Sequence, residues 1–258
     1  MPDDRVLHFD SIHNFRDYGG YAARGGHLVR GRLWRSGQHG EATSADLARV
    51  RDLDIRTVID LRGDSERAAH PCLRHPDFAG EVLFFPGETA GRTGRAVHEE
   101  SARPLTTPDD ARAAMTRLYK GIAFREVLVG SLRLYLDALA TRDGGSLLHC
   151  MAGKDRTGLG VALVHHLLGV HHDDIMADYL MTNTAGDVAA RITAQSRGFA
   201  NSTFDEAAVR VILSVEPEYL DTLFAAIRER HGSVEAYARD LLSFGPAQVG
   251  AMEARLIT

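Results

Sequence analysis

The stretch Ser146-Leu-Leu-His149-Cys150-Met-Ala-Gly-Lys-Asp-Arg156-Thr157-Gly-Leu-Gly160 decides the fold. Its first apolar run predicts a short strand that ends at His149, and the apolar residues from Thr157 to Leu168 predict a buried helix. A strand, a loop and a helix in this order point successive backbone N–H groups into one concave site at the positive end of the helix. The sequence therefore predicts an anion site, and phosphate is the ligand expected there.

The residue types in the loop indicate nucleophilic chemistry. The positive field at the helix start favours the thiolate of Cys150, which can then act as a nucleophile. Arg156 follows six residues later, and its planar fork can hold two phosphoryl oxygens into the transition state. A buried inert thiol is the alternative, but it leaves the arginine unexplained. Cys72 has no such context and is interpreted as structural.

Outward from this stretch, the pattern alternates between strands and helices. We expect a strand over 28–36, a helix from Thr43 or Ser44 to Leu53, buried strands over 57–61 and 82–85, and one or two helices over 108–139. Residues 87–107 read as an exposed loop, and 173–258 as helices. This order predicts one α/β domain over 1–258, with a central, mostly parallel sheet flanked by helices, a lid or insertion around 87–125 and a helical cover over 173–258.

Composition and charge exclude several classes of protein. A net charge of −5 and a pI near 6.2 argue against a nucleic-acid binder. No stretch of 18 apolar residues is present to span a membrane. The first residues are acidic and resemble no secretory signal, which indicates a cytoplasmic location; export without a cleaved signal is the alternative. Two cysteines are too few for a disulfide scaffold.

No metal or cofactor is expected. Gly153-Lys154 differs from a nucleotide-binding loop, because Leu148 replaces its first glycine and Asp155 replaces the Ser or Thr that holds magnesium. The histidine pairs at 165–166 and 171–172 lack a matching set of further ligands. A covalent phosphocysteine would take over the activating role of a metal ion.

The chain also resembles a family of bacterial tyrosine/serine protein phosphatases, which includes mycobacterial protein tyrosine phosphatase B and a Listeria lipid phosphatase. The likeness covers most of the chain and rests on segments 14–17, 31–36, 60–62, 149–158, 177–180 and 218–237. It implies a cysteine-phosphatase-type core with a helical lid. It also implies activity on phosphotyrosine, with phosphoserine, phosphothreonine and phosphoinositides as further substrates, so the partner is a phosphorylated protein or a phosphoinositide.

The resemblance implies roles for the loop residues that match the motif of the family. Cys150 is implied to be the nucleophile, Arg156 the clamp and Asp155 a catalytic carboxyl. A carboxylate beside a phosphate is repelled when ionised, so Asp155 suits the role of general acid only if it holds a proton or faces the leaving oxygen. The expected substrate-binding residues are the rest of the loop and the start of the helix, namely Met151, Ala152, Gly153, Lys154 and Thr157.

Two of these roles have alternatives. The family carries an aspartate after its strand-end Phe-Pro, whereas here Gly87 and Glu88 follow Pro86, so Glu88 is the alternative acid. Thr157 could donate to the sulfur of the nucleophile or cap its own helix.

Two other functions and one bracing contact also follow from these residues. A catalytically weak phosphopeptide- or phosphoinositide-binding module is the first rival, and a thiol carrier in redox or sulfur transfer is the second. Intact Cys150 and Arg156 favour the enzyme. We also expect Arg16 and Asp17 to form an ion pair that braces the loop.

Overall fold

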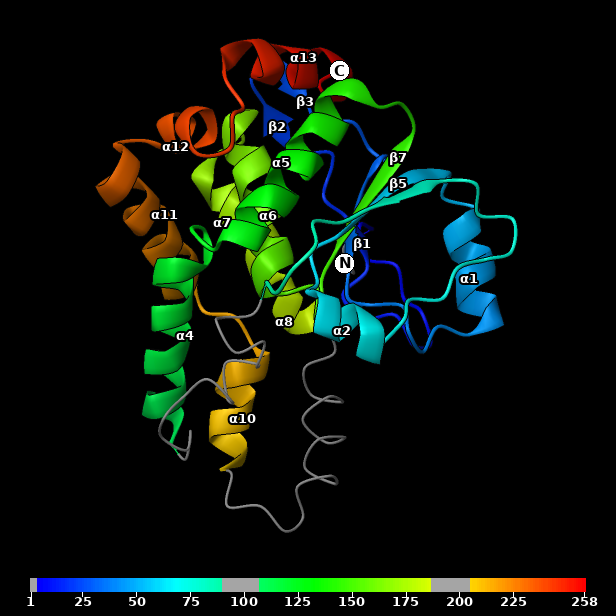
Figure 1. Ribbon diagram of the computed structural model, residues 1–258, viewed down its shortest axis with the longest axis horizontal. Coiled ribbons are helices and arrows are strands. Elements are labelled where there is room, and N and C mark those ends of the chain that lie inside the picture. Colours follow the sequence, from blue (N-terminus) through cyan, green and yellow to red (C-terminus); the bar gives the residue numbers. More distant parts are fainter. Residues whose placement is uncertain (1–3, 90–106, 187–204) are drawn as a thin grey trace.

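The core is a five-stranded sheet in the order β1-β4-β7-β5-β6, in which only β1 runs antiparallel to its neighbour. The computed structural model describes residues 4–89, 107–186 and 205–258 (Figure 1). The strands of the sheet are β1 (Arg16–Asp17), β4 (Leu33–Ser36), β5 (Ile55–Asp60), β6 (Glu81–Leu83) and β7 (Gly145–His149), and β2 (Ala22–Ala23) pairs with β3 (Gly26–His27) beside it. The predicted α/β fold with a mostly parallel sheet is confirmed.

The two faces of the sheet are covered unequally. Successive side chains of a strand point to opposite faces, and on β7 Leu147 packs under helix α1 (Ser44–Arg51) while Leu148 packs with the larger group of helices. Figure 1 shows α1 alone on its side of β5 and β7. Strands buried on both faces read as continuous apolar runs, which is why the run before Cys150 identified β7.

The helices of the larger group follow the apolar periodicity of the sequence. Thr107 caps the helix at Pro108, and its hydroxyl accepts a hydrogen bond from the N–H of Asp110. The helices beyond α1 are α2 (Asp64–Ala69), α4 (Pro108–Ile122), α5 (Glu126–Thr141), α6 (Asp155–Leu167), α7 (His172–Leu180), α8 (Thr182–Ala185), α10 (Glu206–Leu213), α11 (Pro217–His231), α12 (Val234–Asp240) and α13 (Pro246–Leu256).

The site lies where the parallel strands end. Strand β7 passes directly into the loop 150–154 and then into α6, while β5 is followed by the turn that starts α2. Loops at the carboxyl ends of parallel strands form the usual binding edge of an open α/β sheet. Helix α10 packs against α4 through Ala208, Val211 and Ala111, close to the same edge (Figure 1).

Two expectations from the sequence need correction, and a third falls largely outside the described residues. The strand expected over 28–36 covers only Leu33–Ser36, since the backbone turns at Gly31, whose φ is 74°. The strand expected to be buried over 82–85 covers only Glu81–Leu83, lies at the edge of the sheet in the described residues and has an exposed Val82, and Phe84 just after it is 47% exposed. Of the loop expected over 87–107, residues 90–106 lie outside the described residues.

None of the helices in the described parts of the chain combines the length and the hydrophobicity that a membrane span requires.

Candidate active site

The loop after β7 directs its backbone N–H groups into the site. Within the described residues, the N–H groups of Met151, Ala152, Gly153, Asp155 and Arg156 donate no hydrogen bond to the protein. Helix α6 begins at Asp155, so the free N–H groups of its first turn add to those of the loop. Such an array, at the positive end of a helix, binds the oxygens of an anion.

The carbonyl groups of the loop are bound from outside. Gly153 O accepts hydrogen bonds from Asn14 Nδ2 at 2.8 Å and from Arg35 Nη2 at 3.0 Å, and Met151 O accepts one from Gln38 N at 3.0 Å. Gly153 has a φ of 65°, and a Cβ at this position would lie 2.4 Å from the backbone of Ser36. Because its carbonyls are held outward, the loop presents its N–H groups inward.

A buried ion cluster supports the loop from below. Asp178 of α7 binds Arg16 Nε at 3.2 Å on one carboxylate oxygen and Arg35 on the other, and the side chains of both arginines are fully buried. Burial, and then the charge of Arg35, lower the pKa of Arg16 to about 10. Burial opposes ionisation of Asp178, but the two arginines outweigh it and lower its pKa. One carboxylate is therefore shared by two guanidinium groups.

The expected pairing of Arg16 with Asp17 is wrong. Adjacent residues of a strand point to opposite sides, so Asp17 faces away from Arg16 and binds Arg30 Nε at 2.9 Å and the N–H of Gly31 at 2.8 Å.

Cys150 lies at the end of β7 and is 2% exposed. Arg156 is held beside it by Glu66 of α2, since its Nη2 donates to Glu66 Oε1 at 2.7 Å and its Nη1 donates to Glu66 Oε2. Nη1 also donates to Thr89 Oγ1 at 2.7 Å. Burial lowers the pKa of Arg156, but the hydrogen bond to Glu66 and the charge of Cys150 raise it further than burial lowers it. The guanidinium is therefore permanently charged.

Glu66 occupies only one of the two hydrogen-bonding edges of the Arg156 guanidinium. A guanidinium has two edges for bidentate binding, one formed by Nη1 and Nη2 and one formed by Nε and Nη2. Glu66 takes the first edge, and Nε donates to no acceptor within the described part of the chain. The second edge can therefore bind two oxygens of one phosphoryl group.

Asp155 is held by a chain of tyrosines. Tyr119 of α4 donates to Asp155 Oδ1 at 2.7 Å, and Tyr179 of α7 donates to the hydroxyl of Tyr119 at 2.8 Å. Lys154 Nζ lies 3.4 Å from the same carboxylate oxygen. Only 23% of the Asp155 side chain is exposed, so its orientation is fixed by α4 and α7.

The side chain of Lys154 binds helix α10. Its ammonium group donates to the carbonyl of Ile212 and, at 3.2 Å, to that of Ser214, at the end of α10. Cations are favoured at this negative helix end. The lysine thus connects the loop to α10 and is 4% exposed.

The sequence left two alternatives open, a capping role for Thr157 and an acid role for Glu88. Thr157 Oγ1 is buried and has no hydrogen-bond partner within the described residues, so it caps no group of its own helix. Glu88 accepts hydrogen bonds from the N–H and the hydroxyl of Ser65, at 2.9 and 2.8 Å. Both oxygens of Glu88 therefore serve the first turn of α2.

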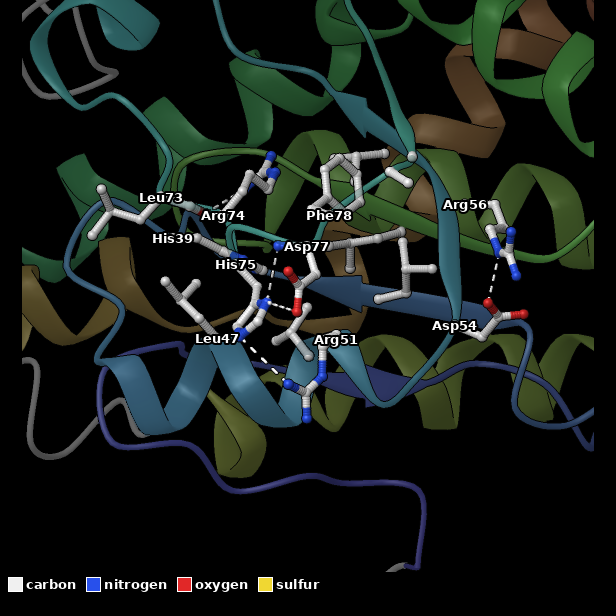
Figure 2. Close-up of a pocket in the computed structure, with 16 residues that line it drawn as sticks. His39, Leu47, Arg51, Asp54, Arg56, Leu73, Arg74, His75, Asp77 and Phe78 are labelled. Atoms are coloured by element: carbon white, nitrogen blue, oxygen red, sulfur yellow. Dashed lines mark hydrogen bonds and ion pairs between the residues drawn. The ribbon is translucent and has the colours of Figure 1, made fainter.

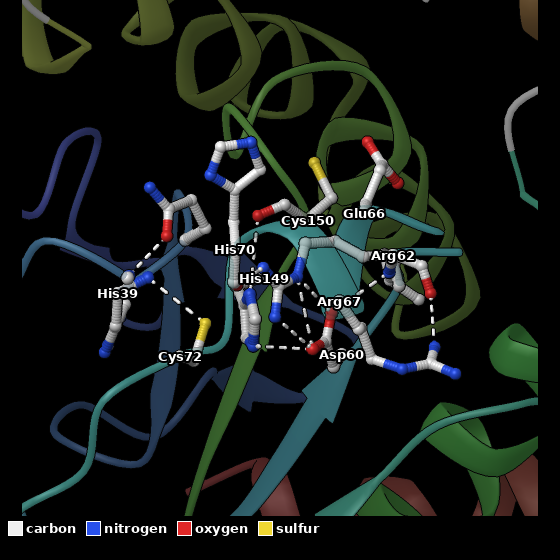
Figure 3. A network of polar contacts seen from close by, with 12 residues as sticks. His39, Asp60, Arg62, Glu66, Arg67, His70, Cys72, His149 and Cys150 are labelled. Carbon is white, nitrogen blue, oxygen red and sulfur yellow. Dashed lines mark hydrogen bonds and ion pairs between the residues drawn. The ribbon is translucent and has the colours of Figure 1, made fainter. Parts of the chain in front are cut away.

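Behind the loop, Asp60, Arg62 and His149 form a buried cluster (Figure 3). Arg62 donates to Asp60 through Nε at 2.9 Å and through Nη2 at 2.8 Å. Burial opposes ionisation of Asp60, but His149 and Arg62 lower its pKa to about 2. Burial lowers the pKa of His149 to about 4, so at neutral pH this ring is uncharged and its 3.8 Å approach to Asp60 is not an ion pair.

One group of potential metal ligands occurs in the described residues, formed by Asp60, Cys72 and His149. Arg62 already binds both carboxylate oxygens of Asp60, and its positive charge opposes a second cation at this place. We therefore assign no metal to this group.

Sequence reasoning missed Glu66, Thr89 and Tyr119. Only Glu66 had an indirect signal: an arginine with as little as 14% of its side chain exposed, such as Arg156, favours a carboxylate partner, and Glu66 follows a strand end that also lies at the site.

Comparison with known proteins gives consistent findings. A family model described as "Tyrosine phosphatase family" matches residues 7–258. The chain is 36% identical over 251 residues to a Cupriavidus necator protein named as a candidate tyrosine-protein phosphatase, covering 94% of this chain and 86% of the relative. It is 32% identical over 256 residues to the Mycobacterium tuberculosis "triple specificity protein phosphatase PtpB", covering 88% of this chain and 90% of the relative.

Proposed function

Because the chain belongs to the tyrosine phosphatase family, we propose that it hydrolyses phosphate monoesters through a phosphocysteine intermediate on Cys150. The observation that carries this proposal is the loop itself. Inward N–H groups and the open edge of Arg156 lie around Cys150, the first residue after β7. This arrangement matches the three equatorial oxygens of a phosphoryl group in transfer.

In the first step, the thiolate of Cys150 attacks phosphorus and the bond to the leaving oxygen breaks. The loop N–H groups of Met151, Ala152 and Gly153 and the Nε–Nη2 edge of Arg156 hold the charge on the equatorial oxygens. Asp155 gives its proton to the leaving oxygen. Since Oδ1 is bound by Tyr119, we assign this proton to Oδ2.

In the second step, water attacks the phosphocysteine and the bond between phosphorus and sulfur breaks. Asp155 takes a proton from the water, and the thiolate of Cys150 is restored. Thr157 donates its hydroxyl hydrogen to the departing sulfur, which would explain why this buried hydroxyl binds no other group of the described residues. We favour Asp155 over Glu88 as the acid because both oxygens of Glu88 bind Ser65.

Phosphotyrosine is the substrate class that we propose first, with phosphoserine, phosphothreonine and phosphoinositides as further substrates. The name of the mycobacterial relative, "triple specificity", supports a test of more than one class. Lys154 could contact an acidic substrate only after its ammonium group leaves the carbonyls of Ile212 and Ser214. A role for this lysine in substrate binding therefore requires movement at α10.

Steady-state assays with the purified chain test the proposal. A phosphotyrosine peptide, a phosphoserine peptide and a phosphoinositide are each supplied in the presence of a chelator, and Cys150→Ser is the matched variant. We expect turnover that survives chelation and disappears in Cys150→Ser. If the chain binds vanadate but turns over none of the three substrates, the proposal is refuted in favour of a phosphate-binding module.

A further inference from the structure

A pocket of about 320 Å³ lies on the other face of the sheet, between α1, β5 and the segment 73–80 (Figure 2). Neither Cys150 nor Arg156 lines it. Its inner wall is apolar and comes from α1, from both central strands and from that segment; this wall consists of Leu47, Val50, Ile55, Val58, Phe78 and Leu147. A concave apolar pocket with a few polar groups at its margin is typical of a small-molecule site.

Most charged groups at the margin already have partners. Arg51 donates through Nε and Nη2 to its neighbour Asp52, at 2.9 and 2.8 Å, and Arg56 donates to Asp54 at 2.6 Å. These pairs neutralise their own charges. They leave little reason for either arginine to bind a ligand.

Arg74 is different. It lines the pocket, and among the described residues its Nε is buried without a hydrogen-bond partner and its one hydrogen bond runs from Nη1 to the carbonyl of Leu73 at 3.0 Å. No carboxylate of the described residues pairs with it, and its guanidinium carbon lies 5.9 Å from the centre of the Phe78 ring. A positive charge next to an apolar wall is therefore left without a counterion from the described chain.

His39 adds a second unsatisfied group. It lines the same pocket and is 1% exposed, and its Nε2 lies 3.0 Å from Ser36 Oγ, while its Nδ1 has no partner in the described residues. Buried polar atoms without partners are rare in folded proteins and call for an explanation. A polar ligand atom at this end of the pocket would supply one.

We propose that this pocket binds a small amphipathic carboxylate, with its aliphatic or aromatic body on the apolar wall and its charged group at Arg74. At the roughly 30 Å³ that a water takes in the liquid, a volume of about 320 Å³ holds roughly ten non-hydrogen atoms. Inorganic phosphate does not suit the pocket, because the apolar wall would leave its oxygens unbound. The site is separate from the phosphate loop and independent of the proposed phosphatase activity.

His39, which lines the pocket, also lies next to residues that hold the phosphate loop in place. His39 follows Gln38, whose N–H donates to the carbonyl of Met151 at 3.0 Å, and its ring stacks on that of His149 at 5.7 Å. Figure 3 shows His39 and Cys72 on one side of His149 and Cys150 on another. The carboxylate therefore binds behind the loop without entering it, so it should not compete with inorganic phosphate.

The test uses octanoate, which has ten non-hydrogen atoms, and octanamide, which has the same shape without the charge. Titration calorimetry on the full chain is expected to show octanoate binding about tenfold more tightly than octanamide, as one charge-assisted contact implies. Arg74→Gln should remove this preference. The matched variant Arg51→Gln should keep it, because Arg51 lines the same pocket but is paired with Asp52.

Two further measurements locate the ligand. Val50→Trp should fill the pocket and abolish binding of both compounds, and in the wild-type chain the octanoate chain should give nuclear Overhauser effects to the ring of Phe78. Binding should persist in saturating inorganic phosphate. The proposal is overturned if octanoate and octanamide bind equally, if Arg74→Gln keeps the preference, if phosphate displaces octanoate, or if the effects to Phe78 are absent.

Discussion

Glu66→Gln should slow catalysis because it removes one of the two hydrogen bonds by which Glu66 holds the guanidinium of Arg156. The carboxylate accepts hydrogen bonds from both Nη1 and Nη2, whereas a glutamine has one oxygen and would turn its own NH₂ group towards the other nitrogen. One charge-assisted hydrogen bond is lost, which contributes about 2 kcal/mol. If the activation free energy rises by this amount, kcat/KM falls about 30-fold.

The assay is steady-state hydrolysis of a phosphotyrosine peptide, measured well below the melting temperature of each variant. Glu81→Gln is the matched control, since Glu81 also binds an arginine, Arg142, but does so at the exposed edge strand. A purely structural role for Glu66 would lower the melting temperature and leave kcat/KM unchanged. That result, or an equal loss in Glu81→Gln, would refute the reasoning.

Three further outcomes are expected. Tyr119→Phe removes the donor to Asp155 Oδ1 and should lower kcat about fivefold with KM unchanged, as peptide kinetics would show. Gly153→Ala places a Cβ on the backbone of Ser36 at positive φ and should lower the melting temperature by about 4 to 8 °C, whereas Gly121→Ala, with open space around it, should not. Burial lowers the pKa of His149 to about 4; the unfolded chain therefore takes up this proton first, and urea titrations should show the free energy of unfolding fall as pH drops from about 6.5 to about 4.

The sequence predicted the features that depend on neighbouring residues. The strand 146–149, the loop and the helix after it were visible because apolar runs and turn residues follow one another along the chain. Helix α1 was also found; of the two caps that the sequence left open, Thr43 and Ser44, Thr43 is the one used, and the helix ends at Arg51 and not at Leu53. The edge position and exposure of β6 were not predicted, because a short apolar run does not show where its strand lies in the sheet or what packs on its faces.

The partners of the site residues depend on contacts between distant segments. Arg156 meets Glu66, which is 90 residues away, and Asp155 meets Tyr119, which is 36 residues away. Nothing in the local pattern distinguishes these residues from ordinary helix-surface residues. Lys154 is the same case, since its acceptors are the carbonyl groups of Ile212 and Ser214 and a backbone carbonyl leaves no signature in a sequence.

The cluster of Arg16, Arg35 and Asp178 has a consequence for how the protein evolves. Two fully buried guanidinium groups share one carboxylate, so a net positive charge stays beneath the loop, where dehydrating it opposes folding. An anion in the loop would relieve that charge, so ligand binding and folding reinforce each other. Apolar replacement of both arginines alone would leave the buried carboxylate of Asp178 without a counterion and destabilise the chain, so the cluster can be exchanged for apolar residues only if all three positions change together.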